Sequence, residues 1–598
     1  MTSRSFLWLA IACGCYHGVS ANGDESSSST SSAVTTNATT TTNATTTSDV
    51  DAGSDEAPPP DLPPPNQPPI AMFDATPESG SATLSVMLDA SASSDPDGTI
   101  VAYDWSFPDG DDEGMTLAHD FTAVGCHDLE LTVTDDDGAT ASASTTVVVA
   151  QGVAEVPPMA TVDRSPLPSA VLARDLDTDE GTASFHGTVA SNGYTAVLAE
   201  VLVGETVMST VSVPLCGVAP VEFDIDVPIP AELVAHDVRL SLVGADMPQP
   251  FFTVTDLVAG DLYLIQGQSN AVAAALAGDA NENQNPFVRS FGSNTTDGTA
   301  SAADVAWRVA EGNAGGGAAA IGQWGIRMGA QLSASAAIPI GIVNGALGGQ
   351  PISYFQRNDA NTIDPASNYG RLLTRLRAAG IEHSLRAILW YQGESDGGAA
   401  QVHHDGFVAL VQDWTEDYSG FERIYVTQIR AGCGGDIIDT KEIQRELADE
   451  FTEISLMSTT ALDGHDGCHY AYENGYRELG DRYAALLGRD LYDDAPMYDV
   501  APPNPMSATL MGTTQIVVTM RNAASTLTFA DGAQTDFAVI GAPVTVTSGM
   551  AVDDTIVLTL SGDASTATAV QYFGHVGAGA WVTNEAGVGL LAFSIPLQ

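Results

Sequence analysis

Positively charged residues are scarce in this chain. Its 598 residues include 20 Lys and Arg against 76 Asp and Glu, which gives a formal net charge of −56. So acidic a surface repels phosphate backbones, and we therefore expect no nucleic-acid partner. Lys441 is the single lysine, which leaves almost no candidate for Schiff-base chemistry. The length predicts about three to five domains, each able to bury its own core.

Cysteine is also rare, with six in the whole chain, and this excludes a scaffold built on disulfides. Cys433 and Cys468 fall in one predicted domain and can pair in an exported protein, but the sequence leaves their pairing open. The thinly scattered Cys and His residues offer no zinc set. We expect the chemistry of the protein to require neither a metal nor another cofactor.

Long apolar runs are absent, so no segment is predicted to span a membrane. The N-terminus carries Arg4 and a short apolar run at 6–12, which ends in Ala-Ile-Ala before Cys13. This resembles a bacterial lipoprotein signal, in which the cysteine is lipidated, although Ala10 replaces the usual leucine and Cys15 is a second candidate. An ordinary cleaved signal peptide is the alternative. Either predicts an exported protein, secreted or attached to the cell surface or outer membrane only through an N-terminal lipid.

Residues 20–68 are rich in Ser, Thr and Pro and cannot bury enough apolar surface to fold, so we interpret them as a disordered tether. Residues 69–150 alternate apolar and polar residues between Asp and Gly turns, which predicts a β-sandwich. The stretches LDASASSDPDGTIVAYDWSF and LELTVTDDDGATAS resemble the PKD domain, an Ig-like module, with Trp105 in its core. Asp95 and Asp97 are candidate Ca²⁺ ligands, with Asx-turn chemistry as the alternative.

The rest of the chain falls into three predicted parts. Strand-like runs at 157–255 and at 500–598 each predict a further β-sandwich. Between them, from 256 to 490, apolar strands alternate with helices, which indicates a parallel sheet covered by helices on both faces. The predicted fold is therefore multidomain, with a signal region at 1–19 and a central three-layer α/β domain flanked by Ig-like β-sandwiches. In such a domain, ligands bind beyond the carboxyl ends of the strands.

The first of these strand ends carries Gly-Gln-Ser-Asn at 267–270. Gly267 allows a sharp turn after the predicted strand 262–266. Ser269 then lies in the first turn of the following helix, where the exposed amides favour developing negative charge. An ordinary helix cap is the alternative, and a nucleophilic serine requires a base.

The last predicted strand, 454–459, leads to Asp466-Gly467-Cys468-His469. An aspartate three residues before a histidine can hold one ring nitrogen of His469, which leaves the other to accept the Ser269 proton. Asp463 and His465 are the fallback pair. A rival cluster at the start of a predicted surface helix consists of His403, His404 and Asp405. We expect a surface role for that cluster.

Two further strand ends complete the predicted pocket. Gly348 and Gly349, in LGGQPI, bring the backbone close to a ligand, where an amide can donate to an oxyanion. Which of the two glycines does so is left open. Gln392, in LWYQGESD, can donate from the same side. Glu394 is expected to orient Gln392 or its loop.

The blocks GQSN, LGGQPI, LWYQGESD and DGCHY, in this order, resemble the SGNH-hydrolase superfamily with its flavodoxin-like fold. Within it they are similar to the sialate O-acetylesterase and acetylxylan esterase group of carbohydrate esterases. The resemblance covers about 256–490. It implies a triad of Ser269, Asp466 and His469. It also implies an oxyanion hole formed by the amides of Ser269 and Gly348 or Gly349 together with Gln392.

The resemblance gives Asn270 and Glu394 supporting roles, while Ala271 replaces the methionine usual after GQSN. The implied activity is that of a serine carboxylic-ester hydrolase that removes acetyl groups from sialic acid or xylan-type polysaccharide. Two alternatives remain, a catalytically silent carbohydrate-binding protein and a lipase-like SGNH esterase. A hydrogen bond between serine and histidine would argue against the silent protein. The sequence does not fix the oligomeric state.

Three tryptophans bear on substrate binding, because each can either stack on a sugar or fill the core. They are Trp307, Trp324 and Trp390.

Overall fold

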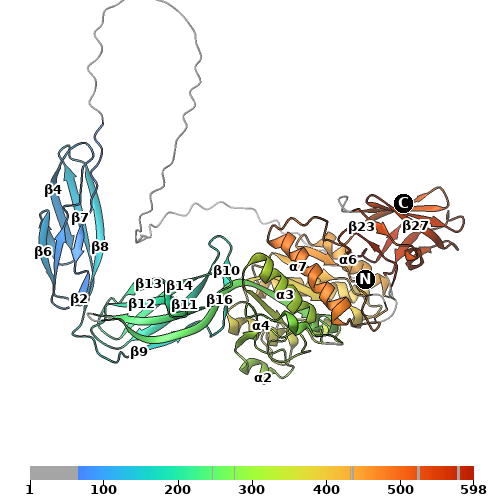
Figure 1. Ribbon diagram of the computed structural model, residues 1–598, viewed down its shortest axis with the longest axis horizontal. Coiled ribbons are helices and arrows are strands. Elements are labelled where there is room, and N and C mark those ends of the chain that lie inside the picture. The colour runs from blue at the N-terminus through green and yellow to red at the C-terminus, as the bar shows by residue number, and fades with distance from the viewer. Residues whose placement is uncertain are drawn as a thin grey trace, which may run out of the picture. The chain divides into compact units, whose positions relative to one another are not determined.

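The computed structural model describes residues 65–244, 247–274, 277–430, 432–433, 437–521, 526–574 and 579–598. The expected signal region with Cys13, and the tether up to residue 64, lie outside these residues. The chain divides by its contacts into a unit of residues 1–65 and a unit of residues 66–598, shown in Figure 1. In the part of the chain that is described, no helix is long and apolar enough to cross a membrane.

The first folded segment is a β-sandwich of two sheets. One sheet contains β1 (Asp74–Thr76), β3 (Leu84–Asp89) and β6 (Thr116–Phe121). The other contains β2 (Ser79–Ser81), β8 (Thr140–Ala150), β7 (Gly125–Asp135), β4 (Ile100–Phe107) and β5 (Gly110–Glu113). Burial alternates strictly along β3, as expected for a strand with one face in the core. Trp105 is 1% exposed and donates its ring N–H to the carbonyl of Gly114.

A second group of antiparallel strands follows. Its members are β9 (Ala160–Arg164), β10 (Val171–Asp175), β11 (Glu180–Val189), β12 (Ala196–Val203), β13 (Thr206–Pro214), β14 (Val221–Pro230) and β15 (His236–Val243). A disulfide between Cys126 and Cys216 joins this sandwich covalently to the first one. No pattern in the sequence predicted that bond.

The strand β16 (Gln249–Gly267) connects this sandwich to the α/β domain. Its first part pairs antiparallel with β15, and its second part pairs parallel with β19 (Ile340–Asn344) and β20 (Leu385–Tyr391). The boundary expected between residues 255 and 256 therefore falls inside one strand. Because 257–267 are buried on both faces, the alternating pattern of a sandwich strand is lost there.

The α/β sheet has the parallel order β19, β16, β20, β21 (Arg423–Thr427) and β22 (Ile454–Met457). Beside β19 lie β17 (Val288–Phe291) and then β18 (Trp307–Val309). On one side of β16 lie β19, β17 and β18. On the other side lie β20, β21 and β22, which all come later in the chain. The order therefore reverses at β16, and the carboxyl end of such a strand is where ligands bind.

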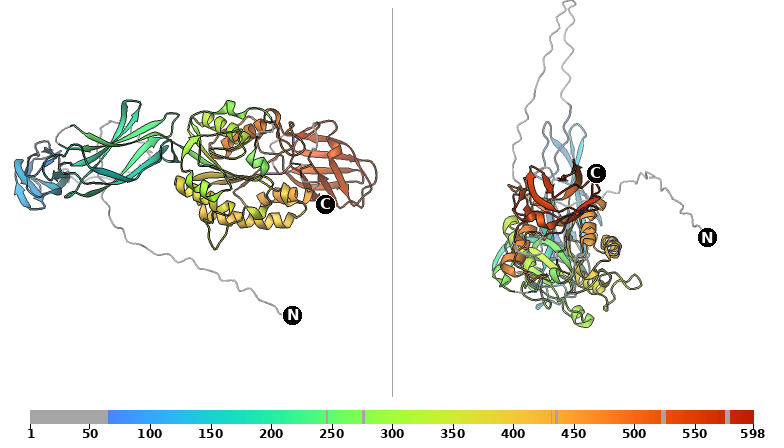
Figure 2. Two further views of the ribbon diagram at one scale, coloured as in Figure 1. Left: turned by 90° about the horizontal axis from the view of Figure 1, so that it is seen from below. Right: turned by 90° about the vertical axis from the view of Figure 1, so that its right-hand side faces the viewer.

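Helices cover both faces of this sheet (Figure 2, left). On one face lie α3 (Gln323–Ala336) and α7 (Arg477–Leu491), which pack with Tyr263 and Ile265 of β16. On the other lie α4 (Asn368–Ala379), α5 (Ala400–Asp417) and α6 (Ile438–Glu450), which share a core with Leu262 and Leu264. The shorter helices are α1 (Ser269–Val272), α2 (Gly298–Ala303), η1 (Ala280–Asn283), η2 (Ile352–Tyr354), η3 (Glu394–Asp396) and η4 (Tyr472–Tyr476).

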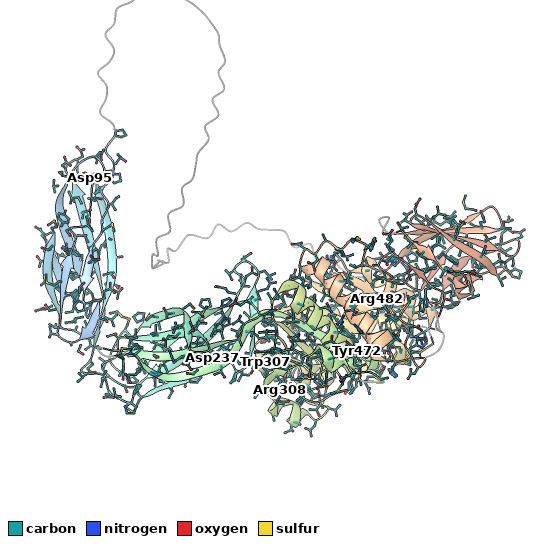
Figure 3. All side chains as sticks on the ribbon, viewed as in Figure 1. Asp95, Asp237, Trp307, Arg308, Tyr472 and Arg482 are labelled. Carbon is teal, nitrogen blue, oxygen red and sulfur yellow. A yellow bond between two sulfur atoms is a disulfide. The ribbon has the colours of Figure 1, made fainter. Side chains whose placement is uncertain are left out.

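The three tryptophans considered for sugar stacking belong to these cores. Trp307, which Figure 3 labels, is 5% exposed, and Trp324 and Trp390 are fully buried. Trp324 stacks on Tyr483 and donates its ring N–H to the carbonyl of Asn270. None of the three is available to stack on a sugar.

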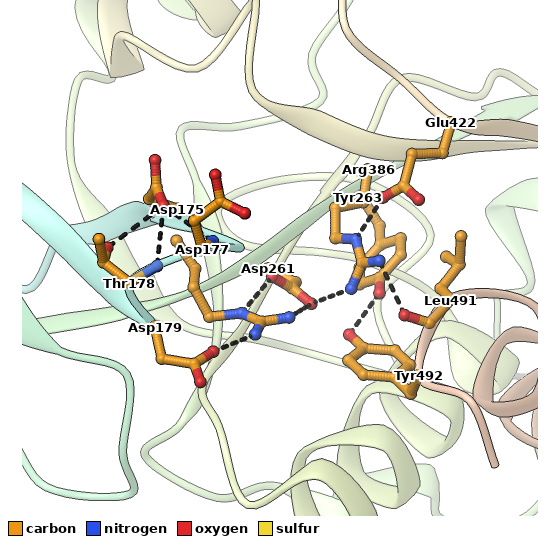
Figure 4. Close-up of polar contacts among 11 residues, drawn as sticks. Asp175, Asp177, Thr178, Asp179, Asp261, Tyr263, Arg386, Glu422, Leu491 and Tyr492 are labelled. Carbon is orange, nitrogen blue, oxygen red and sulfur yellow. Dashed lines mark hydrogen bonds and ion pairs between the residues drawn. The ribbon is translucent and has the colours of Figure 1, made fainter. Parts of the chain in front are cut away.

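A buried ion cluster holds the second sandwich to the α/β sheet (Figure 4). Asp261 of β16 is 2% exposed and accepts two 2.9 Å hydrogen bonds from Arg174 of β10. It also accepts a 2.8 Å hydrogen bond from Arg386 of β20, and the hydroxyls of Tyr263 and Tyr492 meet beside it at 2.5 Å. Burial acts to raise the pKa of Asp261, but the two arginines outweigh it and hold the pKa below its usual range.

The C-terminal sandwich contains β23 (Pro505–Met511), β24 (Gln515–Met520), β28 (Thr555–Leu560), β27 (Val546–Val552), β26 (Phe537–Ile540), β29 (Ala569–Tyr572), β31 (Phe593–Pro596), β25 (Thr528–Phe529), β30 (Val582–Thr583) and the short helix η5 (Ala533–Asp536). It is bonded to the α/β domain. The side chain of Gln428 both donates to the carbonyl of Ala592 and accepts from its amide, at 2.8 and 2.7 Å. Lys441, the single lysine, donates to the carbonyl of Phe573.

Candidate active site

Ser269 is the first residue of α1, directly beyond β16. Gly267 ends the strand with φ = +133°, and a β-carbon there would lie 2.2 Å from the carbonyl oxygen of Tyr391. Only glycine therefore lets β16 close against β20 at this turn. The sequence predicted a helical run after Ser269. In fact α1 has four residues, so a single turn of exposed amides, rather than a long helix dipole, faces the site.

Ser269, Gly348 and His469 line one cavity of about 330 Å³. Its other walls are Val272, Ala274, Gly315 and Tyr476. A β-carbon placed on Gly348 would lie 3.5 Å from the β-carbon of Ser269, whereas one on Gly349 would meet nothing within 4 Å. Gly348 is thus the glycine beside the serine, and Gly349, with φ = +71°, makes the turn next to it.

Asp466 and His469 lie on the loop after β22, as expected from their spacing. One carboxylate oxygen of Asp466 accepts the backbone amides of Cys468 and His469, at 2.9 and 2.8 Å. These bonds hold the pKa of Asp466 below its usual value, so the carboxylate is ionised at neutral pH. The other oxygen lies 3.9 Å from Nδ1 of His469, which is longer than a hydrogen bond.

Within the described ranges, no hydrogen bond joins the Ser269 hydroxyl to His469, although both side chains line the cavity. In free enzymes, catalytic hydrogen bonds are often long and tighten only when substrate binds. Among the same residues, no hydrogen bond uses the backbone amides of Ser269 and Gly348. The cavity is therefore lined by the residues of two unused amides, Ser269 and Gly348, together with His469.

The fallback residues occupy other positions. Nδ1 of His465 accepts the amide of Gly467, and Nε2 lies 2.7 Å from a guanidinium nitrogen of Arg430. Asp463 is exposed, and its amide donates to the carbonyl of Asn474. Since both nitrogens of His465 are already in contact, His469 is the better candidate for a base.

Gln392 is fully buried beside this cavity and is not among the residues that line it. Its side-chain nitrogen donates to Asp396 at 2.9 Å. The same nitrogen lies 3.3 Å from two further acceptors, the side-chain oxygen of Gln268 and the carbonyl of Gln350. One N–H is therefore held firmly, and the other makes only long contacts.

Glu394, expected to orient Gln392 or its loop, contacts Asn270, the other residue with an expected supporting role. Its carboxylate accepts a 2.8 Å hydrogen bond from the side-chain amide of Asn270. Burial raises the pKa of Glu394 to about 6. Its second oxygen is buried and has no hydrogen-bond partner in the described structure.

The expected surface role of His403 is wrong. His403 is fully buried, and its Nδ1 lies 2.7 Å from a carboxylate oxygen of Asp396. The helical period contained the signal, because His403 lies four residues before Phe407 and eleven before Trp414, both in the core. His404 is the partly exposed neighbour, and it pairs with Glu450 at 2.7 Å.

Comparison with known proteins finds two families. Residues 259–488 match the family described as carbohydrate esterase, sialic acid-specific acetylesterase, and residues 66–150 match the PKD domain. The chain is thus a multidomain protein with a carbohydrate esterase domain of that family and an N-terminal PKD domain. This confirms the resemblance found in the sequence. The esterase match includes every residue discussed for the site.

Three solved structures are similar to parts of this chain. A carbohydrate acetylesterase from Xanthomonas citri is 18% identical, with a TM-score of 0.54 over 73% of this chain and 99% of its own. A protein from Arabidopsis thaliana is 19% identical over 38% of this chain and 98% of its own, with a TM-score of 0.32. The PKD1 domain of Vibrio anguillarum Epp is 36% identical over 14% of this chain and 96% of its own, with a TM-score of 0.13. The first of these shows a shared fold.

Proposed function

We propose that this protein is an exported carbohydrate O-acetylesterase of the SGNH-hydrolase superfamily. The observation that carries the proposal is the meeting of Ser269, Gly348 and His469 around one cavity at the carboxyl end of β16, inside the segment that matches a carbohydrate esterase family. Acetylated sialic acid and xylan-type polysaccharide are the proposed substrate classes.

The proposed mechanism is hydrolysis in two halves. His469 takes the proton from the Ser269 hydroxyl as the oxygen attacks the acetyl carbonyl carbon. The resulting oxyanion accepts hydrogen bonds from the amides of Ser269 and Gly348, with Gln392 as the third donor. The carbon–oxygen bond to the sugar breaks, and the sugar oxygen takes the proton from the imidazolium. Water then attacks the acetyl carbon of the acetyl-serine while His469 takes a proton from the water. The bond between that carbon and the serine oxygen breaks, the serine oxygen takes the proton from the imidazolium, and acetic acid leaves and ionises to acetate.

Asp466 is proposed to stabilise the imidazolium that forms in each half. Its carboxylate is ionised, and one oxygen is fixed by two backbone amides, which leaves the other for Nδ1 of His469. The 3.9 Å separation is proposed to shorten to a hydrogen bond when substrate binds.

The cavity favours a short acyl group. At about 330 Å³ it lies near the lower end of the range for small-molecule sites, about 300–1,000 Å³. Its apolar walls, Val272 and Ala274, suit a methyl group, and it lacks the room that a lipase needs for a long chain. The acetylesterase is therefore preferred over the lipase-like alternative.

The domain organisation is proposed as follows. Residues 1–19 form a signal region with lipidation at Cys13, and residues 20–68 tether the folded part. The folded domains are the PKD-like sandwich at 69–150, the second sandwich at 157–255, the esterase at 256–490 and the C-terminal sandwich at 500–598. Such an organisation would place the enzyme at the cell surface, near polymeric carbohydrate.

One observation favours a second candidate, a catalytically silent carbohydrate-binding protein. The hydroxyl of Ser269 makes no hydrogen bond to His469 among the described residues, and His469 stands 3.9 Å from Asp466. A silent protein would bind acetylated sugar without cleaving it.

Acetate release separates these functions. We expect wild type to release acetate from acetylated xylan or O-acetylated sialic acid, and from 4-nitrophenyl acetate in preference to the palmitate ester. Ser269→Ala should lower kcat about a thousandfold or more. The matched control is Ser335→Ala, at an exposed position on α3, which should keep full activity. Binding without any acetate release would favour the silent protein instead.

A further inference from the structure

A second aspartate–histidine pair lies behind the active site. Nδ1 of His403, on α5, is 2.7 Å from a carboxylate oxygen of Asp396, in η3. The two side chains are 0% and 3% exposed. Neither residue lines the cavity of Ser269, so the proposed mechanism uses neither directly.

The neighbours of His403 decide which of its two ring nitrogens carries the proton. The side-chain oxygen of Gln444 accepts the amide of Ile429, so its nitrogen is the donor. That nitrogen donates to the carbonyl of Gln392 at 2.8 Å and lies 3.3 Å from Nε2 of His403. Nε2 is therefore the acceptor, and the ring proton sits on Nδ1, where it is donated to Asp396.

Asp396 accepts hydrogen bonds from two segments of the site. Its first oxygen accepts the backbone amide of Ile352, at 2.8 Å, in the loop that begins at Gly348. Its second oxygen accepts both His403 and the side-chain nitrogen of Gln392. One carboxylate thus fixes the loop of the glycine donor and the side chain of the glutamine donor.

The carboxylate of Asp396 is ionised in this position. Burial acts to raise its pKa, but the hydrogen bonds from His403, Ile352 and Gln392 outweigh burial and hold the pKa below its usual value. An ionised acceptor makes stronger hydrogen bonds than a neutral one. The three donors are therefore held more firmly than a neutral side chain would hold them.

We infer that His403 and Asp396 are positioning residues for the oxyanion hole, acting through Gln392 and the loop 348–352. The role rests on the proposed esterase function. Asp466 and His469 serve the proton transfer, and the second pair serves charge stabilisation. Neither residue of the second pair touches the substrate.

The inference is tested by replacing His403 in two ways. His403→Leu removes the donor to Asp396, whereas His403→Asn places an amide N–H where Nδ1–H stood. We expect His403→Leu to lower kcat on 4-nitrophenyl acetate about 10-fold to 100-fold, less than the loss of a whole oxyanion donor, with KM within about twofold. His403→Asn should recover most of the loss. The control is His404→Asn on the same helix, which should match wild type.

A tetrahedral inhibitor gives a readout that a purely structural role would not move. Methylboronic acid forms an adduct with a serine hydroxyl that has the shape of the acetyl intermediate. Its inhibition constant should rise in His403→Leu by the same factor as kcat/KM falls, while the inhibition constant of acetate stays unchanged. Asp396→Asn should behave in the same way, and it takes the place of His403→Leu if that variant does not fold.

The outcomes distinguish a failure of the positioning role from a failure of the proposed esterase function. If wild type is active but His403→Leu, or Asp396→Asn in its place, keeps kcat within about threefold, the positioning role is overturned and the esterase stands. Equal losses in His403→Leu and His403→Asn also overturn it. An inactive wild type overturns both.

Discussion

The side-chain amide of Asn270 donates to the carboxylate of Glu394 over 2.8 Å, directly behind the proposed nucleophile. The same nitrogen lies 3.3 Å from the carbonyl of Cys468, the residue before His469. The side-chain oxygen of Asn270 accepts the hydroxyl of Tyr476 at 2.7 Å. One buried amide thus joins the turn of the serine, the loop of Glu394 and the loop of the base.

Asn270→Ala should therefore damage both stability and catalysis. It leaves Glu394 and the Tyr476 hydroxyl buried without their partner, which costs about 1–3 kcal/mol for each group. We expect a clearly lower melting temperature and a lower kcat, because the serine and the base lose their common anchor. Calorimetry and 4-nitrophenyl acetate kinetics check this. The control Tyr476→Phe leaves only one buried group, the side-chain oxygen of Asn270, without its partner, and should cost about 1–3 kcal/mol, less than Asn270→Ala. Unchanged stability in Asn270→Ala would contradict the proposed anchor.

Glu394 predicts a dependence of stability on pH. Burial raises its pKa from 4.5 to about 6, so the folded state binds more protons than the unfolded state between these values. Stability from this group is fully present below pH 4.5 and is lost as the pH rises to about 6, a change of about 2 kcal/mol. Glu394→Gln, which resembles the protonated acid, should lack this dependence of stability on pH.

The measurement is the melting temperature of the α/β domain at pH 4.5 and pH 7 for wild type and Glu394→Gln. As the pH rises from 4.5 to 7, we expect the melting temperature of Glu394→Gln to rise relative to that of wild type. A difference in melting temperature that stays the same at both pH values would show that Glu394 does not titrate in this window.

The sequence predicted local patterns better than long-range contacts. Strand ends pointed to Ser269, Gly348 and His469 because parallel strands finish at one edge. The role of Asp396 was not predictable, since its partners Ile352 and His403 are 44 and 7 residues away and meet it only in the folded chain. The link between Cys126 and Cys216 was missed for the same reason, because it joins two predicted domains.

The boundary within β16 shows a different limit. The change of pattern from alternating to continuous apolar residues predicts a domain boundary at 255–256. That change reports burial on both faces, and a single strand passes from a sandwich into a sheet covered by helices without a break.

The disulfide between Cys433 and Cys468 fixes the residue next to His469. In the chain-entropy description, closing a loop of 35 residues stabilises the folded state by about 4 kcal/mol. Replacing both cysteines with serine should lower the melting temperature and kcat together, because the base loop loses a covalent support. The control is the double serine variant at Cys126 and Cys216, which should keep kcat. Full activity in the first variant would contradict this account.

The Asp261 cluster predicts that the second sandwich and the esterase unfold together. Asp261→Asn leaves Arg174 and Arg386 buried with no carboxylate between them, and breaking a buried pair costs about 3–5 kcal/mol. We expect calorimetry to show one shared transition for both domains, shifted down in the variant. Arg164→Gln removes an exposed pair with Asp224 and should change stability by less than about 1 kcal/mol. Two separate transitions in wild type would contradict the prediction.

The central claim is that Ser269 is a nucleophile activated by His469. The most direct test treats the protein with a fluorophosphonate, which bonds covalently to activated serine, and locates the modified residue by mass spectrometry. We expect a single modified serine, Ser269, with labelling abolished in Ser269→Ala and strongly slowed in His469→Ala, in parallel with the loss of acetate release. Rapid acetate release from a protein whose Ser269 stays unmodified would contradict it.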